Sequence, residues 1–190
     1  MRESTSESSG NAWTITAAGR GNLVFDYLNR FNQQAFYEIE TLRGAEAADI
    51  FRVRSTGIAM TLDGGANYDQ VEFTGQQDIT LGQPTSEGIN LIDIESLSGD
   101  PLTENTLRSA SSGGQWELQP GHLTSAGLAV DFSNFSHLIG GGDGDHNPLF
   151  VSPSLNALIL REGEYNGQIV FGASHIKFDN ISLLQPIQVD

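Results

Sequence analysis

The stretch Phe132-Ser133-Asn134-Phe135-Ser136-His137-Leu138-Ile139-Gly140 decides how this chain is interpreted. Its apolar residues follow a fixed spacing. A bulky apolar residue is followed by Ile or Phe three positions later, and by Leu three positions after that. Self-similarity at intervals of about 20–50 residues is typical of stacked-repeat architectures, so copies of this phrase predict a repeat-built domain. The phrase occurs four times, at Phe36–Ile39–Leu42, Leu91–Ile94–Leu97, Phe132–Phe135–Leu138 and Phe178–Ile181–Leu184.

Each phrase is expected to consist of two strands joined by a corner. Residues 129–132 and 175–178 alternate polar and apolar side chains with the period of two that strands have. Asn134 and Asn180 follow, and asparagine tolerates the left-handed backbone of a tight corner. The alternative is a helix, because residues at i, i+3 and i+6 also share one helix face. The segment from Phe36 to Ala48 fits that alternative best.

Two longer copies of the pattern begin with a tryptophan strand, at residues 12–16 and 115–118. Further short strands are expected at residues 49–54, 59–62, 70–73, 157–160 and 167–172. The expected fold class is all-β, a parallel β-solenoid with imperfect repeats, and the alternative is an antiparallel β-sandwich. Residues 12–190 are expected to form a single domain after a disordered lead-in of residues 1–11.

The charge balance of 9 basic against 24 acidic residues gives a net charge of −15. Such a chain repels phosphate backbones and anionic lipid surfaces, so we expect no nucleic-acid partner and no membrane insertion. There is no cysteine, which excludes disulfides and thiolate metal sites. The first ten residues lack the apolar centre of a signal peptide, so an export signal would lie outside this segment.

Three segments carry a resemblance to a known family. Residues 64–71, Gly-Gly-Ala-Asn-Tyr-Asp-Gln-Val, resemble the glycine- and aspartate-rich nonapeptide of RTX-type secreted proteins. Residues 94–99 and 135–145 resemble the connectors between such repeats in large, adhesin-like bacterial surface proteins. The resemblance implies an extracellular or cell-surface location, as part of a larger exported protein, with calcium as the cofactor. The family's fourth-position glycine is replaced here by Asn67 and Asp143.

The resemblance also implies calcium ligands. Asp143, Asp145 and Asn147 share one glycine-rich loop, and Asp69 occupies the retained aspartate position of the other copy. Calcium takes 6–8 oxygen ligands, of which an isolated nonapeptide supplies only some. The alternative for residues 143–147 is a solvated glycine turn, and the alternative for Asp69 is an exposed hairpin turn.

No catalytic motif stands out: there is no H-E-x-x-H, G-x-S-x-G, P-loop or dinucleotide fingerprint. We therefore expect no enzyme but a non-catalytic structural or adhesive module, with a glycan or another surface protein as partner and with end-to-end self-association. The alternatives are a carbohydrate-binding or polysaccharide-degrading β-helix domain and a calcium-stabilised module. Trp13 and Trp116 are expected to fill the core, the alternative being that they stack on sugars.

Overall fold

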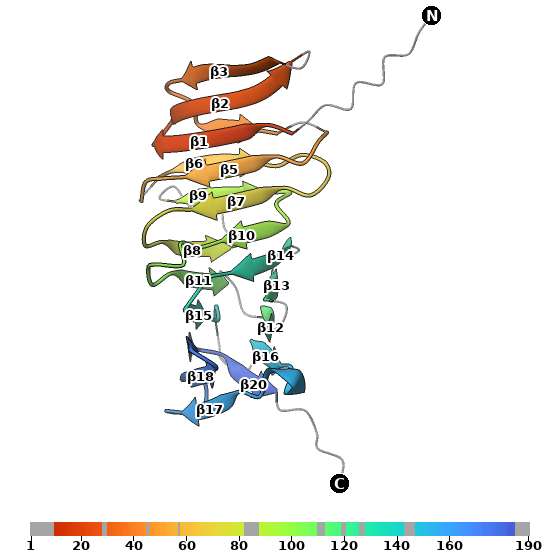
Figure 1. Cartoon of the computed structure of the whole chain (residues 1–190). Coiled ribbons are helices and arrows are strands. Elements are labelled where there is room, and N and C mark those ends of the chain that lie inside the picture. The colour runs from red at the N-terminus through yellow and green to blue at the C-terminus, as the bar shows by residue number, and fades with distance from the viewer. Residues whose placement is uncertain are drawn as a thin grey trace, which may run out of the picture.

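The computed structural model describes residues 10–27, 30–44, 46–56, 58–81, 88–109, 113–118, 121–125, 128–142 and 147–184. Over these residues the protein is all-β, with three sheets, and its single helical element is the 3-10 turn η2 (Pro153–Leu155). The strands follow one another along one long axis, from the red N-terminal strands to the blue C-terminal ones (Figure 1).

The largest sheet has eleven strands in the order β20-β16-β12-β13-β14-β10-β7-β5-β1-β2-β3. The β1–β5, β5–β7, β7–β10, β10–β14, β12–β16 and β16–β20 pairs are parallel, and the remaining pairs are antiparallel. The strand bounds are β1 (Ala12–Ala17), β2 (Arg20–Tyr27), β3 (Arg30–Phe36), β5 (Ile50–Val53), β7 (Gln70–Phe73), β10 (Ser96–Ser98), β12 (Gln115–Leu118), β13 (His122–Ser125), β14 (Leu128–Ser133), β16 (Pro148–Val151) and β20 (Ser182–Leu184).

Two smaller sheets complete the fold. The six-stranded sheet has the order β17-β18-β19-β15-β11-β8, parallel from β8 to β19 and antiparallel beyond. The three-stranded sheet β4-β6-β9 is parallel throughout. The bounds are β4 (Thr41–Arg43), β6 (Met60–Asp63), β8 (Asp78–Leu81), β9 (Ile89–Ile92), β11 (Thr106–Ser109), β15 (His137–Ile139), β17 (Leu158–Arg161), β18 (Gly167–Phe171) and β19 (Ser174–Asp179).

All four copies of the repeated phrase are corners between strands, which confirms the prediction from the sequence. The third residue of each copy has a left-handed backbone: φ is 58° at Glu38, 48° at Asp93, 60° at Asn134 and 57° at Asn180. The helix considered for residues 36–48 was wrong, because β3 ends at Phe36 and β4 begins at Thr41. A left-handed residue between two strands cannot belong to a right-handed helix.

The four corners are not equivalent positions of one repeat. The first leads from the eleven-stranded to the three-stranded sheet, and the second leads back. The third leads to the six-stranded sheet, and the fourth returns from it. In the fourth copy the strand starts one residue sooner after the corner, so Leu183 pairs with Leu149 and Leu184 is 53% exposed. The expectation that Leu184 continues the apolar pattern was therefore wrong.

Parallel pairing stacks the inward side chains in columns. Each large apolar side chain that becomes buried contributes roughly 1.5–3 kcal/mol, so these columns are the main stabilising feature of the stack. One column runs through the eleven-stranded sheet, one through the six-stranded sheet and one through the three-stranded sheet. The columns are Trp13–Phe51–Val71–Leu97–Phe132, Ile79–Leu107–Leu138–Phe178 and Leu42–Leu62–Leu91.

Three-stranded antiparallel meanders occur three times, as β1–β3, β12–β14 and β17–β19. In each, a glycine near the start of the middle strand faces the phenylalanine that begins the next corner. A Cβ at Gly21 would lie 2.6 Å from Phe36 Cζ, and one at Gly167 would lie 2.7 Å from Phe178 Cζ. The aromatic ring thus covers the bare glycine, a packing that stabilises glycine in sheets.

The two tryptophan strands occupy matching places in the first two meanders. Trp13 meets Phe36 edge-on at 6.2 Å between ring centroids, and Trp116 meets Phe132 edge-on at 6.1 Å. Trp116 is buried, and Trp13 is partly buried against the core. The expected kinship of these two segments is therefore confirmed, and the longer hairpin of β2 and β3 accounts for their different lengths.

Candidate functional site

Polar side chains just before the parallel strands link successive passes of the chain. Asp49, Asp69 and Glu95, which we call the carboxylate ladder, lie at the entries to β5, β7 and β10. The Asp49 N–H donates to Asp69 Oδ1 at 2.6 Å, and the Asp69 N–H donates to Glu95 Oε2 at 2.7 Å. The Asn11 N–H donates to Asp49 Oδ1. Each carboxylate therefore accepts from the backbone of the pass before it.

Asp69, one of the predicted metal ligands, is fully buried in this ladder. Its Oδ2 has no hydrogen-bond partner among the residues that the structure describes. Burial raises the pKa of Asp69, and the nearby charges of Asp49, Glu95 and Asp63 raise it further against the lowering effect of the Asp49 N–H. The exposed hairpin turn that was the alternative prediction for Asp69 is wrong. The strands on either side of Asp69, β6 and β7, belong to different sheets, and β7 lies between β5 and β10.

Asparagines take over this role farther along the chain. We call Asn105 and Asn147 the amide ladder. Asn147 Oδ1 accepts from the Gly114 N–H at 3.2 Å, while its Nδ2 donates to the carbonyl oxygens of Gly141 at 2.6 Å and Asn180 at 3.2 Å. Asn147 is fully buried, so its amide serves as a backbone link inside the structure.

Asn105, just before β11 of the six-stranded sheet, repeats the arrangement that Asn147 makes just before β16. Its Oδ1 accepts from the Gln77 N–H at 3.0 Å. Its Nδ2 donates to the carbonyl oxygens of Asp100 at 2.8 Å and of the corner residue Asn134 at 3.1 Å. Both buried asparagines therefore bond a corner carbonyl, Asn134 or Asn180, with their amide nitrogen.

Of the four predicted calcium ligands, the structure describes Asp69 and Asn147, and these two residues lie apart. Four strands, β10, β14, β13 and β12, separate β7, which follows Asp69, from β16, which follows Asn147. At about 4.8 Å per strand this separation is roughly 24 Å. Asp143 and Asp145 lie outside the described residues. Within the described ranges, no three Asp, Glu or His side chains converge to hold a metal ion.

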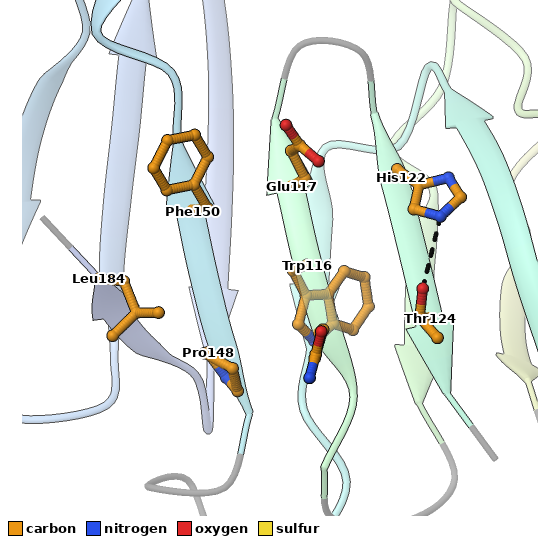
Figure 2. A pocket seen from close by; sticks show the side chains of 8 residues that line it. Trp116, Glu117, His122, Thr124, Pro148, Phe150 and Leu184 are labelled. Atoms are coloured by element: carbon orange, nitrogen blue, oxygen red, sulfur yellow. Dashed lines mark hydrogen bonds between the residues drawn. The ribbon is translucent and has the colours of Figure 1, made fainter. Parts of the chain in front are cut away.

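A groove of about 380 Å³ lies on the outer face of β13, β12, β16 and β20. Alternation along these strands turns Leu123, Leu118 and Leu149 inward, so the intervening side chains face outward. Figure 2 shows the side chains gathered over the four neighbouring strands. The groove is lined by Gln115, Trp116, Glu117, His122, Thr124, Pro148, Phe150 and Leu184.

Strand register divides the groove into a polar and an apolar half. His122 is the cross-strand partner of Glu117, Glu117 of Phe150, and Phe150 of Leu184. Gln115 and Thr124 pair beside the first two of these residues. Phe150 is 39% exposed and Leu184 is 53% exposed. The groove therefore offers hydrogen-bonding groups on β12 and β13 and an apolar platform on β16 and β20.

Hydrogen bonds fix the imidazole at the polar end. His122 Nδ1 lies 2.8 Å from Asp131 Oδ1, and His122 Nε2 lies 3.4 Å from Thr124 Oγ1, the dashed contact in Figure 2. Tyr68 donates its hydroxyl hydrogen to the other Asp131 oxygen at 3.3 Å. The Asp131 carboxylate therefore orients His122, whose second ring nitrogen is directed towards Thr124.

Sequence reasoning did not single out Phe150 or His122. The signal was present, because Pro148-Leu149-Phe150-Val151 alternates in the way that turns Leu149 inward and Phe150 outward. The prediction that Trp116 fills the core was correct. Tyr68 is about half exposed, and its hydroxyl supports the groove through Asp131.

No helix among the described residues has the length and apolar character needed to cross a bilayer. The resemblance to RTX-type repeats stays an expectation drawn from the residues. No protein-family model, curated protein or solved structure matches this chain.

Proposed function

We propose that this chain is a short parallel β-solenoid that serves as a non-catalytic structural and adhesive module of a secreted or cell-surface protein. The observation that carries the proposal is the stacking of inward apolar columns by parallel strand pairs that join distant segments of the chain. Such stacking commits one face of every strand to the core and leaves the other face free for a partner.

The adhesive part of the proposal rests on the outer groove. Sugars have apolar ring faces and hydroxyl edges, and such ligands suit sites that combine an aromatic surface with a few polar groups. Phe150 and Leu184 supply the apolar surface, and Gln115, Glu117 and Thr124 supply donors and acceptors. The net charge of −15 disfavours acidic sugars, so the proposed ligand is a neutral glycan.

A glycan array tests this assignment with the wild-type protein, Phe150→Ala and the control Leu102→Ala. Leu102 is almost fully exposed on the loop after β10 and does not line the groove. Phe150→Ala should weaken glycan binding about tenfold, which corresponds to ~1.4 kcal/mol, and Leu102→Ala should leave it unchanged. Both variants should melt like the wild type. If the wild type binds no glycan, the adhesive part is wrong.

The second candidate function is polysaccharide cleavage in the same groove. The adjacency of Glu117 and His122 across the β12–β13 pair favours it, because a carboxylate beside an oriented imidazole can move protons. A reducing-sugar assay on the glycans that bind separates the two candidates. We expect no new sugar ends, and a signal that Glu117→Gln abolishes would show that the module is an enzyme.

A further inference from the structure

Three side chains at the polar end of the groove are linked in a line. Thr124 and His122 are two residues apart on β13 and therefore face the same side of the sheet. Asp131 of β14 is the cross-strand partner of His122. Thr124 Oγ1 lies 3.4 Å from His122 Nε2 (Figure 2), and His122 Nδ1 lies 2.8 Å from Asp131 Oδ1. A hydroxyl, an imidazole and a carboxylate thus follow one another, the order found in sites where a hydroxyl acts as the nucleophile.

The hydrogen bonds assign the tautomer of His122. A carboxylate only accepts, so His122 Nδ1 carries the hydrogen that Asp131 accepts. In the neutral imidazole the other nitrogen, Nε2, then has a lone pair, to which the Thr124 hydroxyl can donate its hydrogen. Tyr68 donates to the second oxygen of Asp131 at 3.3 Å, so the carboxylate is held on both sides. His122 therefore faces Thr124 with the nitrogen that can accept a proton.

The Thr124 hydroxyl is open to an incoming molecule. Thr124 is exposed and lines the groove of about 380 Å³. Its cross-strand neighbours on β14 and β12 are Ala129 and Gln115. The Ala129 side chain has no hydrogen-bonding group, whereas Gln115 brings an amide that can donate to a developing oxyanion, as Asn and Gln side chains do in acyl-transfer sites. A nucleophile, a base and an oxyanion donor therefore lie on two adjacent strands.

The apolar half of the groove indicates the class of substrate. The platform of Phe150 and Leu184 begins at β16, two strands from β13, a separation of roughly 10 Å at about 4.8 Å per strand. An apolar chain that extends from a carbonyl group at Thr124 can therefore lie against this platform. The net charge of −15 disfavours anionic molecules. The substrate class that fits is a neutral carboxylic ester with an apolar acyl chain.

We infer that Thr124 is a nucleophile that accepts the acyl group of such an ester. Thr124 Oγ1 forms a bond to the carbonyl carbon while its proton passes to His122 Nε2. The bond from that carbon to the leaving alcohol oxygen breaks, and His122 gives the proton to this oxygen. The products are an acyl ester of Thr124 and a free alcohol, and Asp131 is a positioning residue. This inference goes beyond the proposed structural and adhesive function and does not depend on glycan binding.

A fluorophosphonate with an octyl chain tests the nucleophile, because it loses fluoride and forms a stable bond to an activated hydroxyl. Mass spectrometry of the full chain and its peptides should find a single label, on Thr124. Thr124→Ser should keep the label and Thr124→Val should lose it, whereas the control Thr41→Val, at an exposed position of β4, should react like the wild type. Thermal melting checks that each variant is folded. A wild type without the label, or a Thr124→Val variant that still carries it, would overturn the inference.

Labelling rates and an ester test the base and the positioning residue. His122→Gln should slow labelling about a hundredfold and Asp131→Asn about tenfold. The double variant should be no slower than His122→Gln alone, because Asp131 acts only through His122. The wild type should release nitrophenol from p-nitrophenyl octanoate several times faster than Thr124→Val. Equal labelling of His122→Gln and the wild type, a double variant that is slower still, or equal ester cleavage by Thr124→Val and the wild type would each contradict the assignment.

Discussion

The carboxylate ladder and the amide ladder occupy the same kind of position but satisfy it differently. In both, one side-chain oxygen accepts a backbone N–H from the preceding pass of the chain. In the amide ladder the second atom is a donor, and it bonds a carbonyl oxygen of a left-handed corner, that of Asn134 or Asn180. In Asp69 the second atom is Oδ2, which has no partner among the described residues.

The glycines beside the two ladders show how closely the positions correspond. A Cβ at Gly99 would contact the Asn134 carbonyl oxygen and lie 2.8 Å from Asn105 Nδ2. A Cβ at Gly64 would contact the carbonyl oxygen of the corner residue Asp93 and lie 2.6 Å from Asp69 Oδ2. Asp69 Oδ2 therefore lies where the amide ladder has a donor. Burial is the largest cause of the raised pKa of Asp69, and the nearby charges of Asp49, Glu95 and Asp63 raise it further.

The largest effect should come from filling the space that both ladders need. Gly64→Ala and Gly140→Ala should each lower the free energy of unfolding by about 3 kcal/mol or more, because the new Cβ overlaps backbone of the neighbouring pass. Gly163→Ala is the control, since its Cβ would meet only Asn166 Nδ2 at 3.8 Å. Urea denaturation measures all three. Equal stability of the three variants would show that the passes are not in close contact.

A slightly smaller loss should follow when the amide ladder receives a carboxylate. In Asn105→Asp, an oxygen replaces the Nδ2 that now donates to the Asp100 and Asn134 carbonyl oxygens. Leaving buried polar groups unsatisfied costs about 1–3 kcal/mol, so we expect a loss near 3 kcal/mol at pH 7. Asn90→Asp is the matched control, because the Asn90 amide makes one long contact, to Thr61 Oγ1 at 3.5 Å. A loss no larger than in this control would contradict the comparison.

The reverse exchange should stabilise the protein. Asp69→Asn retains an oxygen for the Asp49 N–H and supplies a donor in place of Oδ2, which we expect to add about 1 kcal/mol at pH 7. The pKa of Asp69 is raised above its unfolded value of 3.8, so the wild type gains stability as pH falls through the folded-state pKa towards 3.8. The advantage of the variant should therefore shrink over that window. Thermal melting from pH 7 to pH 4 tests this, and a wild type that loses stability faster than the variant over that window would refute it.

The smallest effect is expected at Asp179, where the pH dependence has the opposite sign. Burial opposes ionisation there, but hydrogen bonds from His137 at 2.6 Å and Lys177 at 3.1 Å, with their charges, lower the pKa of Asp179. Its contribution is present above pH 3.8 and is lost as pH falls through the lowered folded-state pKa. Asp179→Asn should destabilise the protein slightly at pH 7, and this penalty should shrink as the pH falls below 3.8. A penalty that stays constant over this range would exclude the ion pairs as its source.

The strands and two of the corners could be predicted from the sequence because their signals are local. Alternation identified the strands that end at Phe132 and Phe178, and asparagine marked the corners at Asn134 and Asn180. Residue type gave no such signal at Glu38, where tertiary packing imposes a left-handed backbone on a residue that seldom adopts one. The sheet that the chain enters after each corner is decided by contacts between residues far apart in the sequence. The four phrases therefore resemble one another without being equivalent positions of one repeat.

The ladders could not be predicted, because a side chain that bonds a backbone N–H twenty or more residues away leaves no local periodicity. A trace of them is nevertheless present in the sequence. Four turns share a pattern in which a Leu is followed by a Gly two positions later, and then by an Asp or Asn. This pattern assigns Asp69 and Asn147 to the same kind of turn and explains why both are buried. The four turns are Leu42–Gly44–Asp49, Leu62–Gly64–Asp69, Leu97–Gly99–Asn105 and Leu138–Gly140–Asn147.

The central claim is that passes far apart in the chain stack as parallel strands. Nuclear magnetic resonance couplings transmitted through hydrogen bonds test it most directly, because each coupling identifies one donor and one acceptor residue. We predict couplings from the Gln70 amide to the Asp49 carbonyl, from Thr106 to Gln77 and from Lys177 to Ser136. Couplings confined to antiparallel neighbours, as in a β-sandwich, with none of these three long-range links, would contradict the account.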